Sequence, residues 1–299
     1  MNKNNLRSTQ QSSNYVDYRN NLSQDYSGYG WMFEEDLCTT FSIALAKRGE
    51  KRDFYKIESN STKLRELLEC NEYGFLEYKL DDLLEQNMCD LMYYGKAFVE
   101  VIRWYDEDNC LSKISFLPFH YVRQVMVGEK IYFQLKRSNG EKHRGKIERK
   151  DVIVFSLTDL GYAKRSLRKA MEKLNNIKIV DDTMMLKQAA GYDIKADEHK
   201  CLQRVLKITK RFAWPGRMFS SEFVSEPYMY YRNMKFSLTQ KKFLDYLMQG
   251  YNRKLEELGK EYGFEGKITY QCKTEGYEQA MEDLRNGKMN CEDVGKVVF

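Results

Sequence analysis

The chain lacks the features that would assign it to several large classes of protein. Only three of its 299 residues are proline, so long elements are seldom interrupted. No uncharged apolar run approaches the roughly 20 residues that a membrane-spanning helix needs, and the longest candidate, Leu37 to Ala46, is about half that length. The first residues, MNKNNLRSTQQSSNY, are polar and contain no apolar core of a secretory signal. We therefore expect a globular protein that has no contact with a membrane.

Signatures of metal and cofactor binding are also missing. The seven cysteines form no CxxC pair, and an odd number of scattered cysteines is typical of reduced cytosolic thiols. The three histidines, His120, His143 and His199, are not paired with Cys, Asp or Glu at metal-ligand spacing. The GxxxxGKS/T pattern of a phosphate-binding loop does not occur. The sequence therefore predicts no cofactor and no zinc site.

Charge is present in quantity and is unevenly placed. The net charge of the chain is only +5, but residues 160–217 contain 14 Lys and Arg against 6 Asp and Glu. That segment therefore has a surplus of eight positive charges, and the rest of the chain has three more acidic than basic residues. This asymmetry suggests a polyanion partner or an acidic neighbouring subunit. The alternative is a solvated helix face with no partner.

The hydrophobic period of the chain changes abruptly at Gly95. Apolar residues from Leu76 to Leu91 recur at helical spacing, which predicts a helix that ends at Gly95. Residues 97–102 then alternate with a period of two, and further short alternating segments follow. Asn139-Gly140 suits a tight hairpin turn between two of them. We expect residues 97–157 to form an antiparallel sheet docked on the helix.

Helical patterns return after this sheet. Periodic apolar residues predict long helices over 162–190 and about 238–262. Between them we expect a short strand at YDIKA, a compact basic helix at DEHKCLQRVLKITKRF and an aromatic strand at SSEFVSEPYMYYRNMKF. Residues 1 to about 30 have no apolar period and are expected to be an arm ordered only against a partner. The expected fold class is α+β.

Residues that could perform catalysis are few. Asp181 and Asp182 lie together in the basic 162–190 segment, and paired carboxylates can hold Mg²⁺ for phosphoryl chemistry. A nuclease would also need a Glu and a Lys on a neighbouring strand, and no convincing set is present, so ion pairing with nearby Lys and Arg is the favoured interpretation. Tyr228, Tyr230 and Tyr231 could stack on bases, but packing between strands is the commoner role of such residues.

The order of the elements resembles that of portal proteins, the head-to-tail connectors of tailed bacteriophages. The family pattern is a helix ending in Tyr-Gly-x-Ala-Tyr/Phe-x-Glu, then a Leu-Pro strand, a hairpin and an Asp-Val-Ile-x-Phe strand. The residues that match are Tyr94, Gly95, Ala97, Phe98, Glu100, Leu117, Pro118, Val122, Asp151, Val152, Ile153 and Phe155. The resemblance covers roughly residues 61–215.

This resemblance implies a structural protein and no enzymatic activity. Identical subunits would form a closed ring, in that family usually a dodecamer, at the portal vertex of the capsid. Double-stranded DNA would pass through the ring during packaging and ejection without being recognised by sequence. The implied protein partners are the terminase motor, the major capsid protein and neck or tail adaptor proteins, with assembly in the host bacterial cytoplasm. The alternatives are a metal-dependent DNA-processing enzyme and a neck or tail adaptor that makes no contact with DNA.

The resemblance also implies a division of the chain into portal-like parts. These are an N-terminal arm with the first wing elements (1–60), a wing of helix and antiparallel sheet (61–160), a stem-type helix (161–190), a clip-like segment (191–235), and a second long helix with a reduced crown-like region (236–299). Tyr94, Gly95 and Pro118 are expected to be structural residues of the wing, because a glycine lets the chain leave the helix in a conformation that other residues resist.

Four basic residues of the clip-like segment are expected to lie near the narrow exit of the DNA channel. They are Lys207, Lys210, Arg211 and Arg217. There they would meet phosphates or the acidic face of a motor or adaptor, and the acidic surplus outside 160–217 would contribute to the channel wall. In the alternative interpretation the same four residues pair with acidic residues of the next subunit.

Overall fold

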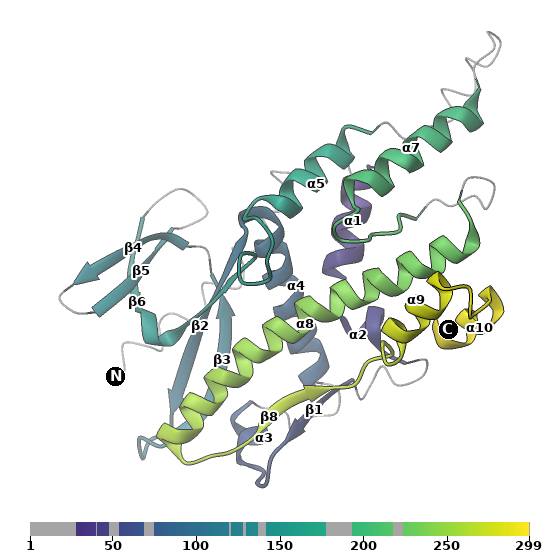
Figure 1. Cartoon of the computed structure of the whole chain (residues 1–299). Coiled ribbons are helices and arrows are strands. Elements are labelled where there is room, and N and C mark those ends of the chain that lie inside the picture. The colour runs from purple at the N-terminus through teal and green to yellow at the C-terminus, as the bar shows by residue number, and fades with distance from the viewer. Residues whose placement is uncertain are drawn as a thin grey trace.

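A computed structural model of the whole chain gives the fold. It describes residues 28–39, 41–47, 54–68, 75–119, 121–127, 130–136, 142–177, 193–217 and 224–298. The elements are α1 (Tyr29–Cys38), α2 (Phe41–Leu45), β1 (Tyr55–Glu58), α3 (Lys63–Leu67), α4 (Phe75–Tyr94), β2 (Lys96–Tyr105), β3 (Leu111–Pro118), β4 (Tyr121–Val127), β5 (Lys130–Lys136), β6 (Lys142–Glu148), η3 (Arg149–Asp151), β7 (Val152–Ser156), α5 (Ser166–Asn175), α7 (Ile194–Ile208), α8 (Glu226–Tyr262), β8 (Lys267–Tyr270), α9 (Tyr277–Arg285) and α10 (Cys291–Val298). Helices and antiparallel sheets are combined in one molecule (Figure 1), so the α+β prediction is confirmed.

The helix that stops at Gly95 is present as predicted. α4 ends at Tyr94, and Gly95 has a φ of +71°, a left-handed conformation that side chains resist. A Cβ at this position would also overlap the backbone carbonyl of Lys164, just before α5. The Gly95 carbonyl accepts a hydrogen bond of 3.1 Å from the Leu157 N–H at the end of β7. The glycine therefore joins the helix, the first strand of the sheet and the entry to α5 at one tight crossing.

The predicted sheet over 97–157 is divided into two three-stranded antiparallel sheets, ordered β3-β2-β7 and β4-β5-β6. Within the described residues no strand of one sheet pairs with the other. The first sheet continues one residue past Pro118, where the Phe119 N–H donates to the Phe98 carbonyl in the register of β2 and β3, and the division follows before β4. It is completed by the 3-10 turn η3, which separates β6 from β7 and lets β7 return to β2.

The prediction of one long helix from residue 162 to 190 is wrong, because within the described residues the helix is shorter at both ends. The chain makes turns after β7, with the Tyr162 N–H bonded to the Leu157 carbonyl, and α5 begins only at Ser166. It ends at Asn175, and residues 178–192 lie outside the described residues.

The strand expected at YDIKA is absent from its described part. Asp193 instead caps the N-terminus of α7 by accepting a hydrogen bond of 3.0 Å from the Ala196 N–H. The basic helix that follows is confirmed as α7.

The prediction of an aromatic strand before residue 238 is wrong. α8 begins at Glu226 and runs without interruption for 37 residues, so Tyr228, Tyr230 and Tyr231 are helical. Ser225 precedes the helix and Pro227 lies in its first turn, where a missing N–H costs nothing. The helix ends at Gly263 in a left-handed conformation.

The main core lies around α8, which crosses the molecule between the β3-β2-β7 sheet and α9 (Figure 1). α1, at the edge of the region expected to be an arm, packs into this core, and its Phe33 contacts the rings of Phe212 and Trp214. β1 and β8, which are far apart in the sequence, pair with each other in a small antiparallel sheet. The division into portal-like parts stays a prediction.

Candidate functional surface

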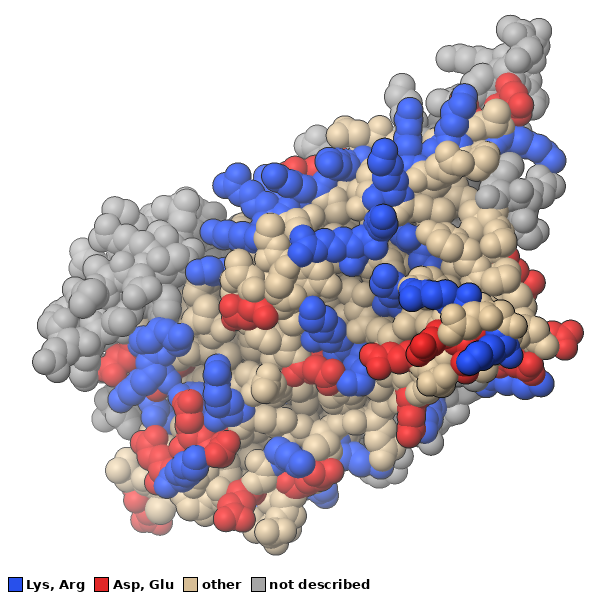
Figure 2. Space-filling model, viewed as in Figure 1, with Lys and Arg blue, Asp and Glu red and all other residues tan. Residues whose placement is uncertain are grey.

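A continuous basic surface is formed by α5, α7 and α8. Figure 2 shows Lys and Arg side chains gathered over this part of the molecule. We call this surface the basic face and define it by the cations that line two neighbouring grooves, Arg165, Lys169, Lys173, Arg211, Lys235, Lys241 and Lys242.

The first groove lies between α5 and α7 and has a volume of about 260 Å³. All its ionisable lining residues are cations, Arg165, Lys169 and Lys173 from α5 with the residue before it, and Arg211 just beyond α7. Apolar side chains complete the lining, among them Ile208 and Phe212. We call it the α5–α7 groove.

The second groove lies between α8 and α9 and is larger, about 1060 Å³. Its α8 wall contains Lys235, Lys241 and Lys242, whereas Glu275 and Glu278 line the opposite wall. Lys241 is paired with Asp245 at 2.6 Å. The second groove therefore has compensated charge, and the α5–α7 groove does not.

Arg211 lines both grooves, and Tyr162 lies beside it in the second. The Arg211 guanidinium carbon lies 5.0 Å and the Lys242 ammonium 5.1 Å from the centre of its ring, and the ring stacks on Phe243. Arg211 also donates a hydrogen bond of 2.6 Å to the Gly161 carbonyl. Burial raises the pKa of Tyr162, and Arg211 partly offsets this effect. Two cations are thus held in place by a largely buried aromatic ring.

The four predicted exit residues do not share one environment. Arg211 belongs to the basic face, and Lys207 and Lys210 are exposed at the end of α7. Arg217 instead contacts α1, with its Nε 2.9 Å from Asp36 and its Nη2 2.7 Å from Glu35. The hydrogen bond to Asp36 raises the pKa of the Arg217 guanidinium. The role of these residues at a DNA exit stays a prediction.

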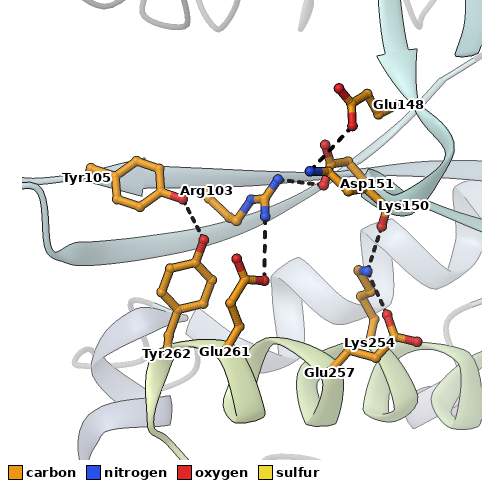
Figure 3. Close-up of polar contacts among 9 residues, drawn as sticks. All are labelled: Arg103, Tyr105, Glu148, Lys150, Asp151, Lys254, Glu257, Glu261 and Tyr262. Atoms are coloured by element: carbon orange, nitrogen blue, oxygen red, sulfur yellow. Dashed lines mark hydrogen bonds and ion pairs between the residues drawn. The ribbon is translucent and has the colours of Figure 1, made fainter. Parts of the chain in front are cut away.

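A separate polar cluster holds the β3-β2-β7 sheet on the C-terminal half of α8 (Figure 3). Arg103 on β2 is 2.5 Å from Asp151 of η3 and 3.8 Å from Glu261 of α8. Burial raises the pKa of Asp151, with the Arg103 charge acting in the opposite direction. Lys254 of α8 donates a hydrogen bond of 2.6 Å to the Lys150 carbonyl. These contacts are structural, because they fix the angle between sheet and helix.

The same cluster contains a pair of tyrosines. The Tyr105 and Tyr262 hydroxyls are 2.7 Å apart and join the end of β2 to the end of α8 (Figure 3). Burial, followed by the hydrogen bond to Tyr105, raises the pKa of Tyr262 to about 12. The Tyr262 hydroxyl therefore stays protonated at neutral pH and acts only as a hydrogen-bonding group.

Several cations of the basic face were not singled out from the sequence. Arg165, Lys169 and Lys173 recur every four residues, a spacing that places them on one side of a helix and could have served as a signal. The α8 lysines lie outside the 160–217 segment, and only the tertiary structure brings them beside it.

Of the residues considered for metal chemistry or base stacking, the structure describes the tyrosines of α8 but not the paired aspartates. Asp181 and Asp182 lie outside the described residues, as does His120. Tyr228 accepts a hydrogen bond from Arg232, one turn further along α8, and Tyr231 accepts one from Arg285 of the α9 helix.

The described part of the chain contains no group of three or more His, Cys, Asp and Glu that could hold a metal ion. Nor is any of its helices long and apolar enough to cross a membrane.

Comparison with known proteins finds weak similarity in structure and none in sequence. No family model and no curated protein matches the chain. Among solved structures, a chain in the virion of a native gene transfer agent particle aligns with 90% of this chain and 89% of its own length, at a TM-score of 0.45 and 9% identity. A similarity of this degree does not transfer a function.

Proposed function

We propose that the chain is the repeating subunit of a virion portal, a ring through which double-stranded DNA passes without being recognised by sequence or cut. Its partners would be further copies of itself in a dodecameric ring, the terminase motor, the major capsid protein and neck or tail adaptors. Its location would be the capsid portal vertex, after assembly in the host bacterial cytoplasm. The chain would act as a structural protein.

The observation that supports this proposal most is the meeting of three dispersed sequence motifs. The Tyr-Gly-x-Ala-Phe-x-Glu segment forms the end of α4 and the start of β2. The Leu-Pro segment ends β3 and the Asp-Val-Ile-x-Phe segment leads into β7, and both strands pair with β2. Glu100 lies opposite Leu117 on one side and Val152 on the other. Residues that resemble the family pattern are therefore neighbours in one sheet.

The rigidity of this sheet is consistent with a wedge-shaped subunit. Gly95 fixes the sheet on α4, and the Arg103 cluster fixes it on α8 (Figure 3). A closed ring of identical subunits requires a constant rotation between neighbours, because heterologous contacts otherwise produce open filaments. A sheet that is attached to both α4 and α8 can keep a constant orientation within each subunit, which a constant rotation between subunits requires.

The proposal is tested by assembly and by the absence of cleavage. Native mass spectrometry of the purified full-length chain should show one closed oligomer and little monomer at high concentration. Duplex DNA incubated with the same sample and Mg²⁺ or Mn²⁺ should stay intact. A monomer at every concentration, or metal-dependent cleavage of the duplex, would contradict the proposal, and cleavage would favour an enzyme.

A further inference from the structure

We infer that the α5–α7 groove is a binding site for the phosphate backbone of double-stranded DNA. The choice of double-stranded DNA as the ligand rests on the proposed function. The site itself rests on the charges, spacing and exposure of the residues that line the groove.

The first argument is that the groove cations have no carboxylate partner. Within the part of the chain that the structure describes, Arg165, Lys169 and Lys173 make no ion pair, and all three are exposed. Arg168 on the same helix is paired with Glu172 at 2.8 Å, and Lys241 and Lys260 on α8 have carboxylates at 2.6 and 2.7 Å. The chain therefore compensates many of its cations but leaves those of the groove uncompensated.

The second argument is the spacing of these charges. Residues four apart on a helix are about 6 Å apart along its axis, so Lys169 and Lys173 of α5, with Arg165 at its N-cap, form an inclined row on one side of the helix. Like charges at this spacing repel each other and weaken the helix by about 0.2–0.5 kcal/mol per pair. A row of uncompensated charge matches a linear polyanion better than a single anion, because each cation can meet a different phosphate.

The third argument is that the groove lining suits backbone contact. Its charged residues are all Arg or Lys, which donate to phosphate oxygens as well as to guanine edges, and it contains no Asn, Gln, Asp or Glu that would pair with adenine or cytosine edges. Arg211, at the opposite wall, is held by Tyr162 and the Gly161 carbonyl, which lowers the entropy cost of fixing it against a phosphate. We therefore expect binding that depends on salt and is insensitive to sequence.

The test uses three full-length proteins and a fluorescently labelled duplex of mixed sequence. The groove variant replaces Arg165, Lys169 and Lys173 with Gln. The matched control replaces Arg65, Lys56 and Lys288 with Gln, which removes the same number and kinds of charge from exposed positions outside the basic face. Fluorescence anisotropy is measured over a range of salt concentrations, and the oligomeric state of each protein is measured by native mass spectrometry.

The wild type and the control should bind with similar salt dependence. For the groove variant the slope of log K against log salt should be shallower by about 0.9 for each phosphate that the protein no longer neutralises, and the affinity at low salt should fall about tenfold or more. Circular dichroism of the variant should be unchanged, because the three residues are exposed and Gln is a good helix former.

Three outcomes would overturn the inference. They are absence of salt-dependent binding by the wild type, an equal loss of binding in the groove variant and the control, and loss of the oligomer in the groove variant alone. The last outcome would assign the groove to an interface with an acidic surface of the next subunit. If binding depends on the groove but the wild type is a monomer, the inference stands and the proposed ring is wrong.

Discussion

Gly95 and Gly263 have nearly the same backbone conformation in very different surroundings. Their φ angles are +71° and +69°, and both follow the last residue of a long helix. A Cβ added at Gly263 would meet nothing within 4 Å, whereas one added at Gly95 would overlap the Lys164 backbone. The two positions therefore separate the cost of a left-handed side chain from the cost of breaking the junction between α4, β2 and α5.

Gly263→Ala should lower the free energy of unfolding by about 1 kcal/mol, the cost of a side chain in the left-handed region. Gly95→Ala should lower it by about 2–4 kcal/mol, because the overlap with a backbone carbonyl is added to that cost. Chemical denaturation of the two variants measures both values. Equal losses would show that the close approach of Lys164 does not constrain Gly95.

Asp90 is a carboxyl group buried in α4, 5% exposed, and burial raises its pKa from 3.8 to about 8. Between these two values the folded protein holds a proton at Asp90 that the unfolded chain has released. The contribution of Asp90 to stability is therefore largest at low pH and is lost as the pH rises toward about 8. This direction is opposite to that of a carboxylate in an ion pair.

Asp90→Asn should remove this dependence, because the amide is neutral at every pH. The difference in unfolding free energy between the variant and the wild type should grow with pH in favour of the variant. The increase should be at most about 1.4 kcal/mol per pH unit between the two pKa values and should level off above about pH 8. Denaturation curves across this range measure it, and a difference that is constant with pH would contradict the assignment.

At the scale of elements, α1 is held to the rest of the protein through Asp36. Its carboxylate accepts hydrogen bonds from the Trp214 indole at 2.7 Å and from Arg217 at 2.9 Å, and its carbonyl accepts one from Gln240 at 2.9 Å. Trp214 is fully buried, so its N–H has no access to water if this partner is removed. Asp36 therefore joins α1, the segment after α7, and α8.

Asp36→Ala should lower the unfolding free energy by about 1–3 kcal/mol, the cost of leaving the buried indole N–H without a partner. Glu35→Ala is the matched control, because Glu35 is more exposed and pairs with the accessible Arg217. Its expected loss of stability is about 0–1 kcal/mol. Thermal unfolding compares the two, and a control that is destabilised as much as Asp36→Ala would refute this account of α1.

The sequence predicts elements well where the local pattern and the tertiary contacts agree. The α4–Gly95–β2 junction is of this kind, because helical spacing, a glycine and alternation follow one another directly. The pattern misleads at Tyr228 and Tyr230, whose alternation resembles a strand although Ser225 and Pro227 begin a helix. The hydrophobic pattern does not predict the turn before α5, which depends on a hydrogen bond from the Tyr162 N–H to the Leu157 carbonyl.

The candidate site was only partly predictable for the same reason. Counting charges identifies the segment 160–217, but the basic face combines part of it with lysines of α8 that are distant in sequence. The count also includes Arg217, which is engaged with Asp36 and Glu35 on α1. Whether a cation is compensated depends on its neighbours in space, which the order of residues along the chain does not reveal.

At the scale of the whole molecule, the sheets and the basic face lie in different parts of the subunit. The β4-β5-β6 sheet lies at one end, and the basic face lies over α5, the end of α7 and the N-terminal half of α8 (Figures 1 and 2). A ring needs one part of each subunit for contacts between neighbours and another for the DNA path. The separation of these features is consistent with such a division.

Electron microscopy of the purified full-length chain tests the proposed portal most directly. The account predicts closed rings of uniform diameter with an open central hole wide enough for duplex DNA, and the Gly95→Ala variant should form fewer of them because the sheet loses its fixed angle. Single subunits, compact dimers without a hole, or open filaments at every protein concentration would contradict it.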